Sequence, residues 1–197
     1  MIAAVVLAAG ASSRFRDQKL LAPVGTKPLV RVVVEGVLES AVDPVCVVLG
    51  REAAGVREAL AGLPLSFVEN PGFAQGMSTS VRCGISALPP GTAGAVVALG
   101  DQPLPTSEII DDLISAFRSS TARIVAPSYA GRRGNPVLFA ADLFPELLEL
   151  EGDRGARGVI ARHPEQLHLV EYPYPPPLDV DTPQDYQRLL EQLGVGG

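Results

Sequence analysis

The 197-residue chain lacks tryptophan, and it contains only two cysteines and two histidines. Because aromatic residues make up 5% of the chain, valine, leucine, isoleucine and alanine must fill its core. Cys46 and Cys83 lie in apolar segments without a CxxC spacing, which favours small buried thiols in a reducing compartment over a disulfide or a thiol site. We assign no role to His163 or His168. Cysteine and histidine chemistry is therefore not where we expect the function to lie.

Positive charge and long apolar runs are also scarce. The net charge of −6 argues against a general nucleic-acid binder, which needs a basic face, but leaves room for a small anionic ligand where a few cations gather. No segment approaches the roughly 18 apolar residues of a membrane span. The first apolar run, residues 2–9, has no basic residue before it, unlike a signal peptide. We expect a cytoplasmic protein without nucleic-acid or membrane partners.

Short apolar runs alternate with longer helical stretches through the first two thirds of the chain. The runs cover residues 2–9, 44–50, 65–70 and 93–101, and the predicted helices cover 28–41, 51–61, 77–88 and 107–119. Unbroken apolar runs are typical of parallel strands that are buried on both faces. With 47% hydrophobic residues, the pattern predicts one α/β domain over residues 1–197, a three-layer, Rossmann-like, doubly wound and mostly parallel sheet.

The later part of the chain is less regular. Residues 122–128 and 135–141 flank the turn-like stretch YAGRRG, which predicts a strand and a returning strand in a small antiparallel hairpin excursion. Helices are expected at 143–150 and 155–163, and short strands at 168–173 and 178–182. A last helix is expected from Pro183, a favourable residue for a first turn, to Leu193.

The stretch VVLAAGASSRFRDQK at residues 5–19 joins the first strand to a polar loop. It is no dinucleotide fingerprint, because Gly10 stands alone, and GTKP at 25–28 has the wrong spacing for a phosphate loop. Small residues at 8–10 leave backbone N–H groups open to an anion, and Arg14 and Lys19 add cations. The spacing alone fits either an anion-binding loop or an ordinary solvated loop.

Carboxylates follow two further segments. Asp101 closes the fourth run in GDQPLP, and Asp179 and Asp181 lie two apart in LDVDTP, on one face of the strand expected there. Ligands of open α/β sheets bind beyond the carboxyl ends of the strands, and carboxylate oxygens suit Mg²⁺ that is shared with phosphates. Taken singly, aspartates in such positions are more often turn or helix-cap residues.

LAAGASSRFRDQKLL resembles the signature LAAGxSxRMGxxK of the nucleotidyltransferases that share the fold of the molybdenum-cofactor and sugar-nucleotide enzymes. Phe15 and Arg16 stand where that signature has Met and Gly. ENPGFAQGMSTSVRCGI at 69–85 resembles its second signature, NPxxxxGMxxSVxxG. The resemblance implies a nucleotide-diphospho-sugar transferase-like fold and catalytic cations Arg14 and Lys19 on the triphosphate. Its implied nucleotide-binding residues are Leu7, Ala8, Ala9, Gly10, Asn70, Gly76, Ser78 and Ser80. The serines of the second signature also fit a purely structural helix start.

The same resemblance implies Mg²⁺ bound by Asp101 and Asp181, with Asp179 behind them. RRGNPVLF at 132–139 and LEGDRGAR at 150–157 border the acceptor in the molybdenum-cofactor subset of the family. The implied acceptor-binding residues are Arg133, Gly134, Asn135, Pro136, Asp153 and Arg157. The charged tip of a hairpin would also simply lie in water.

The expected reaction is Mg²⁺-dependent transfer of CMP from CTP to the phosphate of molybdopterin, with release of pyrophosphate. A molybdoenzyme that receives the product is a further expected partner. The preference for cytidine rests on LAAG, where the guanylyl branch has LAGG, so that a methyl group at Ala9 crowds a purine. The alternatives are a transferase of the same fold that uses GTP or another phosphorylated acceptor (a sugar 1-phosphate, a methylerythritol phosphate or a phospholactate), and a non-catalytic carrier of the molybdenum cofactor.

Overall fold

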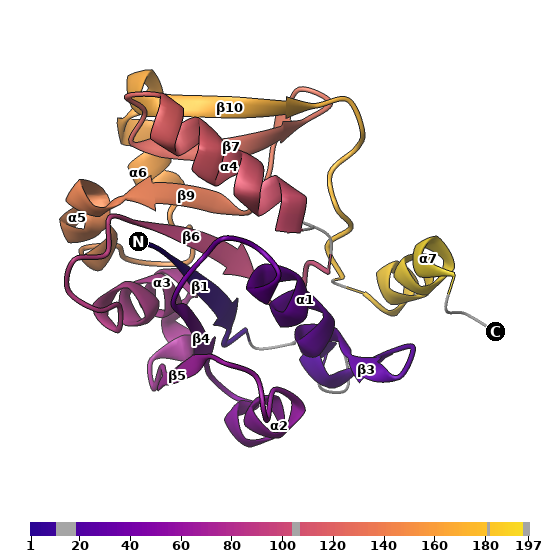
Figure 1. Cartoon of the computed structure of the whole chain (residues 1–197). Coiled ribbons are helices and arrows are strands. Elements are labelled where there is room, and N and C mark those ends of the chain that lie inside the picture. Colours follow the sequence, from indigo (N-terminus) through magenta and orange to yellow (C-terminus); the bar gives the residue numbers. More distant parts are fainter. Residues whose placement is uncertain (11–18, 104–106, 181, 195–197) are drawn as a thin grey trace.

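The computed structural model describes residues 1–10, 19–103, 107–180 and 182–194. They form an eight-stranded sheet with the strand order β10-β7-β9-β6-β1-β4-β5, and β8 pairs with β7 (Figure 1). The strands are β1 (Ile2–Ala8), β4 (Val45–Leu49), β5 (Ser66–Glu69), β6 (Gly94–Leu99), β7 (Ile124–Tyr129), β8 (Arg132–Arg133), β9 (Val137–Ala140) and β10 (Leu167–Tyr172).

The pairing of these strands confirms the predicted fold class. β1 lies in the middle and pairs in parallel with β4 and β6, and β4 pairs in parallel with β5. β9 is antiparallel to both β6 and β7, and β7 is parallel to β10. β9 and the two-residue β8, which is antiparallel to β7, therefore run against an otherwise parallel sheet, and β7 and β10 again run in the direction of β1.

Helices cover both faces of the sheet. Apolar side chains of α1, α2 and α4 pack against one face, and those of α3, α5 and α6 pack against the other. The helices are α1 (Leu29–Leu38), α2 (Ala53–Ala59), α3 (Met77–Ser86), α4 (Ser107–Ser119), α5 (Phe144–Leu148), α6 (Arg157–Arg162) and α7 (Pro183–Leu193). Short 3₁₀ turns are η1 (Lys19–Leu21), η2 (Phe73–Gln75), η3 (Ala141–Leu143) and η4 (Pro164–Gln166). None of the helices in the described part of the chain has the length and apolarity to span a membrane.

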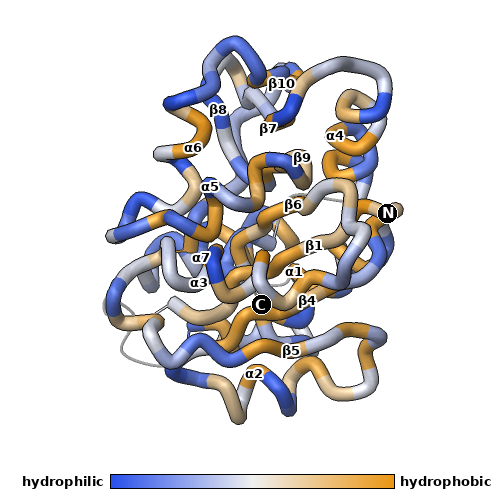
Figure 2. The backbone as a smooth tube through the Cα atoms, turned by 90° about the vertical axis from the view of Figure 1, so that its left-hand side faces the viewer, coloured by the Kyte–Doolittle hydropathy of each residue, from blue (hydrophilic) through white to orange (hydrophobic). Residues whose placement is uncertain are grey.

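Burial explains why the apolar runs became strands. All residues of β1 are buried because helices cover both sides of the middle of the sheet, whereas the edge strands β5 and β10 have exposed positions. Figure 2 shows the same gradient, with β1, β4 and β6 mostly hydrophobic and hydrophilic segments at the periphery. The middle of the sheet is thus a rigid base for the ends of β1 and β6.

The strand expected at 178–182 was wrong for its described residues, because residues 178–180 have no regular secondary structure. Three prolines at 175–177 have no N–H to offer to a sheet. Val180 is instead fully buried with Val24, Leu29 and Leu189. Side-chain packing, and not strand pairing, holds this segment, so the argument that strand alternation puts Asp179 and Asp181 on one face does not apply.

A small hairpin receives the end of the chain. β2 (Pro23–Val24) and β3 (Lys27–Pro28) pair around Gly25, whose φ of 60° suits glycine in a tight turn. The Tyr186 hydroxyl of α7 donates a hydrogen bond to the Pro23 carbonyl. The Thr182 side chain accepts a hydrogen bond from the Asp185 N–H, and the Asp185 carboxylate accepts one from the Thr182 N–H. This capping box starts α7 where the sequence predicted it.

Candidate active site

The carboxyl ends of β1, β4 and β6 meet at one edge of the sheet, and Ala8, Ala9 and Gly10 leave β1 there (Figure 1). Two glycines allow this close approach. A Cβ atom at Gly50 would lie 2.5 Å from the Ala9 carbonyl oxygen, and one at Gly100 would lie 3.0 Å from that of Leu7. Leu7, Ala8 and Ala9 are buried and Gly10 is exposed. The backbone segments therefore pack closely at the carboxyl ends of these strands, and Gly10 is the exposed residue there.

Lys19 and Asp101 form an ion pair at this edge. The Lys19 Nζ atom lies 2.7 Å from the Asp101 Oδ2 atom, and their side chains are 9% and 30% exposed. Lys19 is the first residue of η1, and Asp101 follows β6. A buried ammonium group needs a counter-charge, which Asp101 helps to supply. Arg14 and Asp181 lie outside the described residues, so the structure tests neither.

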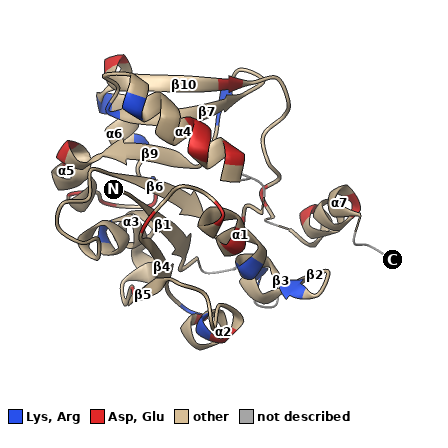
Figure 3. Ribbon diagram, viewed as in Figure 1, with Lys and Arg blue, Asp and Glu red and all other residues tan. Residues whose placement is uncertain are grey.

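Further negative charge lies on α4. Figure 3 shows acidic residues in the part of α4 nearest this edge, where Glu108, Asp111 and Asp112 lie. In a chain with a net charge of −6, an anionic ligand at this edge depends on cations placed locally. Lys19 is such a cation.

Gln102 links the C-terminal segment to the same edge. Its buried side-chain amide donates a hydrogen bond from Nε2 to the Asp179 Oδ1 atom. Asp179 itself is exposed, and the neighbouring Val180 is buried against α7 and the hairpin. Sequence reasoning gave Gln102 no role, although its place directly after Asp101 was a signal. Within the described residues, no group of three or more His, Cys, Asp or Glu side chains could hold a metal alone.

The Asn70 side chain organises the second predicted nucleotide-binding stretch. Its Nδ2 atom donates to the Thr79 and Ser80 hydroxyl oxygens at 2.8 and 3.0 Å, and its Oδ1 atom accepts from the Gly72 N–H at 2.9 Å. The fully buried Ser78 donates from Oγ to the Glu151 carbonyl at 3.1 Å. These polar groups hold the start of α3 in place. That they also contact a base stays a prediction.

The loop at 151–155 packs against the start of α3, which brings two predicted motifs together. Gly76 has φ 115° and ψ 170°, and a Cβ atom there would lie 2.7 Å from the Gly152 carbonyl oxygen. The Asp153 Oδ1 atom accepts a hydrogen bond from the Met77 N–H at 3.1 Å. Asp153, predicted to bind the acceptor, therefore caps the helix that carries the predicted nucleotide-binding serines. This contact joins residues 76 positions apart.

The other predicted acceptor-binding residues lie on two separate elements. Arg133 is exposed on β8, and Arg157 is exposed at the start of α6. Gly134 lies against the ring of Tyr129, and the Asn135 carbonyl accepts a hydrogen bond from the Tyr129 hydroxyl at 3.0 Å. Pro136 is buried. In the described part of the chain, neither Arg133 nor Arg157 has a hydrogen bond or ion pair to Lys19 or Asp101.

Three tyrosines that the sequence analysis missed lie at or just after the carboxyl ends of β7 and β10. The rings of Tyr129, Tyr172 and Tyr174 lie 5.4 to 6.0 Å apart between centroids. The Tyr172 hydroxyl donates to the Asp112 carboxylate at 2.8 Å, which ties β10 to α4. Burial, together with this carboxylate, raises the pKa of Tyr172 above its usual range. The signal was visible in the sequence, where three of the four tyrosines fall at 129 and 172–174.

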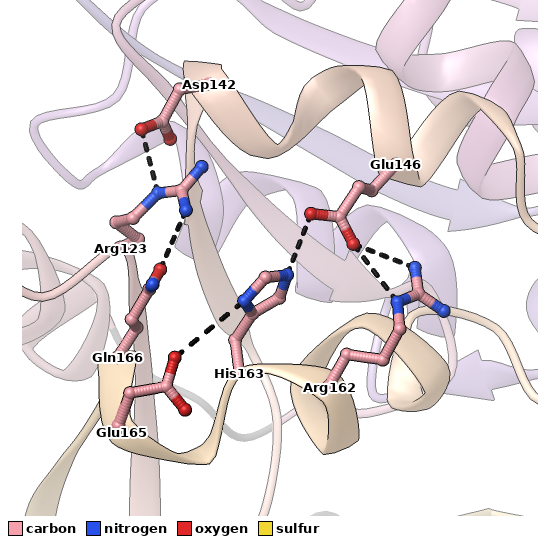
Figure 4. Close-up of polar contacts among 7 residues, drawn as sticks. All are labelled: Arg123, Asp142, Glu146, Arg162, His163, Glu165 and Gln166. Atoms are coloured by element: carbon pink, nitrogen blue, oxygen red, sulfur yellow. Dashed lines mark hydrogen bonds and ion pairs between the residues drawn. The ribbon is translucent and has the colours of Figure 1, made fainter.

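A second polar cluster lies at the opposite edge, at the amino ends of β7 and β10 (Figure 4). Glu146 Oε1 lies 2.7 Å from His163 Nε2, and Glu146 Oε2 accepts from Arg162 at 2.9 and 3.1 Å. Arg123 contacts Asp142 and Gln166. These contacts join α5, α6 and η4. His163 thus takes part in structural contacts at the amino ends of the strands, whereas Asp101 lies at the carboxyl end of β6.

The family follows from the sequence match. The model of the MobA-like NTP transferase domain matches residues 4–167, which include Lys19, the 69–85 stretch and Asp101. The chain belongs to this family. It is thus an NTP-dependent nucleotidyltransferase with a nucleoside triphosphate substrate, and its acceptor is not given by the family. The matched range ends before Asp179.

Relatives of known structure cover nearly the whole chain. Rv0371c from Mycobacterium tuberculosis H37Rv is 32% identical, with a TM-score of 0.84 over 96% of this chain and 97% of its own. A structure of Rv0371C in complex with manganese is 30% identical, with a TM-score of 0.80 over the same shares of both chains. A nucleotidyl transferase from Methanothermobacter thermautotroptrophicus (Mth528) is 27% identical, with a TM-score of 0.85 over 100% of this chain and 99% of its own.

Curated relatives are matched over part of their length. The bifunctional protein GlmU of Kineococcus radiotolerans is 36% identical over 141 residues, which are 66% of this chain and 29% of that protein. The chain thus spans less than a third of such relatives. Two more distant solved structures, 16% and 12% identical, share the fold with TM-scores of 0.81 and 0.78 and bear on the fold alone.

Proposed function

We propose that this nucleotidyltransferase moves CMP from CTP to the terminal phosphate of molybdopterin and releases pyrophosphate. The observation that carries the proposal is the buried Lys19 beside Asp101 at the end of β1 and β6. A triphosphate needs a fixed cation, and a metal ion needs an accessible carboxylate. This edge offers both, next to backbone at Gly10 that is open to phosphate.

The donor set fits Mg²⁺. Asp101 is partly exposed, and its oxygen already faces a positive charge, the Lys19 ammonium group. We assign the metal to Asp101 and Asp181, with Asp179 behind them; the hydrogen bond from Gln102 to Asp179 supports a place for Asp179 near Asp101. The manganese in the Rv0371C structure supports a divalent ion in this family. When bound, such an ion neutralises phosphate charge and aligns the in-line displacement.

The chain's own residues then have to offset charge repulsion during the transfer. The acceptor phosphate oxygen forms a bond to the α-phosphorus, the bond from that phosphorus to the bridging oxygen breaks, and pyrophosphate leaves with the electron pair. Two like unit charges about 4 Å apart repel by about 4 kcal/mol at an effective dielectric constant of 20, so Lys19 and Arg14 must offset repulsion between two polyanions. An acceptor phosphate with a second pKa of about 6 is already ionised at neutral pH and needs no general base.

The residues that we assign to binding of the acceptor molecule are those that the sequence motifs named. Arg133, Gly134, Asn135, Pro136, Asp153 and Arg157 are assigned to the molybdopterin side, and Asn70, Gly76, Ser78 and Ser80 to the nucleotide side. The contact between Asp153 and the start of α3 supports neighbouring nucleotide and acceptor sites. The preference for CTP rests on Ala9. We propose that the methyl group at this position, which is 2% exposed, crowds a purine.

Pyrophosphate release tests the proposal. Molybdopterin and Mg²⁺ are incubated with CTP, GTP or ATP, with the Asp101→Ala variant as control. Release that needs CTP and disappears in the variant supports transfer of CMP and the metal site together. Release with GTP or ATP contradicts the base preference. No release with molybdopterin, but release with a sugar 1-phosphate, a methylerythritol phosphate or a phospholactate, contradicts the acceptor. No release with any pair leaves the carrier alternative.

A further inference from the structure

The ion pair between Lys19 and Asp101 joins two residues to which the proposed function gives different partners. Lys19 is assigned to the phosphates and Asp101 to the metal ion, yet Lys19 Nζ lies 2.7 Å from Asp101 Oδ2. A metal ion on the same carboxylate would lie next to this ammonium group, and the two cations would repel each other. On the basis of the proposed function, we propose that Lys19 is a stand-in cation: it pairs with Asp101 in place of the metal ion and disfavours binding of the free ion there. When a triphosphate binds, Lys19 contacts the phosphates instead.

Burial makes this exchange depend on the triphosphate. The Lys19 side chain is 9% exposed, so its charge is poorly solvated wherever it moves within the site. A metal ion that bound Asp101 without a triphosphate would add positive charge beside the buried ammonium group, with no added negative charge to balance it. A triphosphate supplies the missing negative charge. The metal ion and the triphosphate therefore bind together more favourably than either binds alone, which is a coupling between two ligands.

The site therefore distinguishes between two forms of the metal ion. The site takes a divalent cation as its triphosphate complex and discriminates against the free ion. This discrimination needs no moving domain, because it requires only that one side chain changes partner. Lys19 thus acts twice, first on Asp101 and then on the phosphates.

Binding of Mn²⁺ without any nucleotide tests the first step. The electron paramagnetic resonance signal of free Mn²⁺ is followed for the wild type and for Lys19→Met. We expect Lys19→Met to bind Mn²⁺ on the order of tenfold more tightly, since the competing ammonium group is gone. The matched control is Lys27→Met, which removes one positive charge from an exposed ion pair with Glu35 of 2.6 Å and should leave the affinity unchanged. Adding Asp101→Asn to Lys19→Met should abolish the gain.

A non-hydrolysable CTP analogue tests the second step. In the wild type the analogue should tighten Mn²⁺ binding beyond its own affinity for the ion, and in Lys19→Met this extra coupling should shrink. Lys19→Gln serves as a second variant, and thermal unfolding shows that both variants are folded. Neither step measures turnover.

Three results would overturn the inference. If Lys19→Met binds Mn²⁺ no more tightly while Asp101→Asn weakens binding, the metal site of the proposed function stands and the stand-in role fails. If Lys27→Met tightens binding as much as Lys19→Met, the effect is one of net charge and the stand-in role again fails. If Asp101→Asn changes nothing in any background, the ion does not bind at Asp101, and the metal assignment fails with it.

Discussion

The side-chain amide of Gln102 donates a hydrogen bond to the carboxylate of Asp179, 77 positions later in the chain. Gln102 is buried directly after Asp101, and Asp179 belongs to a segment without regular secondary structure. The bond therefore fixes an irregular segment to the rigid middle of the sheet. It connects the chain around Asp179 with the edge where Lys19 and Asp101 meet.

Gln102→Ala should lower the stability only modestly and should raise the Mg²⁺ concentration that activity requires. The lost bond to an exposed carboxylate is expected to lower the free energy of unfolding by about 1 kcal/mol. Because the segment before Asp181 is released, the Mg²⁺ concentration for half-maximal turnover should rise several-fold. Turnover against Mg²⁺ concentration and urea unfolding measure the two effects. Gln166→Ala, which removes a bond to Arg123 at the opposite edge, is the control and should change stability alone. Equal turnover profiles for both variants would contradict the positioning role.

Gly76→Ala should destabilise the protein by about 3 kcal/mol. Part of this is the cost of a φ of 115° with an extended ψ, which only glycine adopts readily, and part is the close approach of the Gly152 carbonyl. Gly62→Ala separates the two, since Gly62 has a positive φ of 82° but open space around its Cβ position. We expect about 1 kcal/mol there. Urea unfolding curves compare the variants, and equal losses would mean that the contact with 152 contributes nothing.

Glu146→Gln should destabilise the protein at neutral pH, and the effect should fade in acid. Burial raises the pKa of Glu146, but hydrogen bonds from Arg162 and His163 outweigh it, so that the pKa lies below its ordinary 4.5. A lowered pKa adds stability above the unfolded value, and this stability is lost as the pH falls through the folded value. Thermal unfolding from pH 7 to pH 3.5 should therefore show the two proteins converging below about pH 4.5. A constant gap at every pH would count against the ion pair.

Glu52→Gln should have the opposite sign. In the part of the chain that the structure describes, the Glu52 Oε2 atom is buried and has no hydrogen-bond partner, and burial raises the pKa of Glu52 despite nearby Arg51. An acid with a raised pKa destabilises the fold once the pH passes its unfolded value, because the ionised form is poorly solvated. The variant should therefore unfold at a higher temperature than the wild type at pH 7, and the advantage should vanish towards pH 4. A variant that is less stable at pH 7 would contradict this.

Much of the fold was predictable because burial on both faces of a parallel sheet leaves an unbroken apolar run. β1, β4 and β6 have such runs, and α7 begins and ends where its proline and glycine predicted. The strand expected around Val180 failed because an alternating pattern also fits a segment whose two apolar residues, Leu178 and Val180, pack in a cluster with α7. The β2–β3 hairpin was missed because its strands are two residues long.

The sequence motifs named candidate site residues, which stay a prediction, but they did not predict the contacts among those residues. The motifs named Lys19 and Asp101 separately, and only the fold places their side chains in an ion pair. Gln102 and the partners of Asn70 are fixed by contacts between distant segments, which no local pattern carries. Asp153 was named for the acceptor, and its hydrogen bond to the start of α3 depends on the path of a loop.

The anchoring of residues 178–180 to α7 and the β2–β3 hairpin also links two distant parts of the candidate site. The hairpin closely follows Lys19 and η1 in the chain, and Asp179, the hydrogen-bond partner of Gln102, directly precedes the buried Val180. A substitution among the apolar contacts of α7 would therefore disturb the surroundings of both Lys19 and Asp179 without altering either residue.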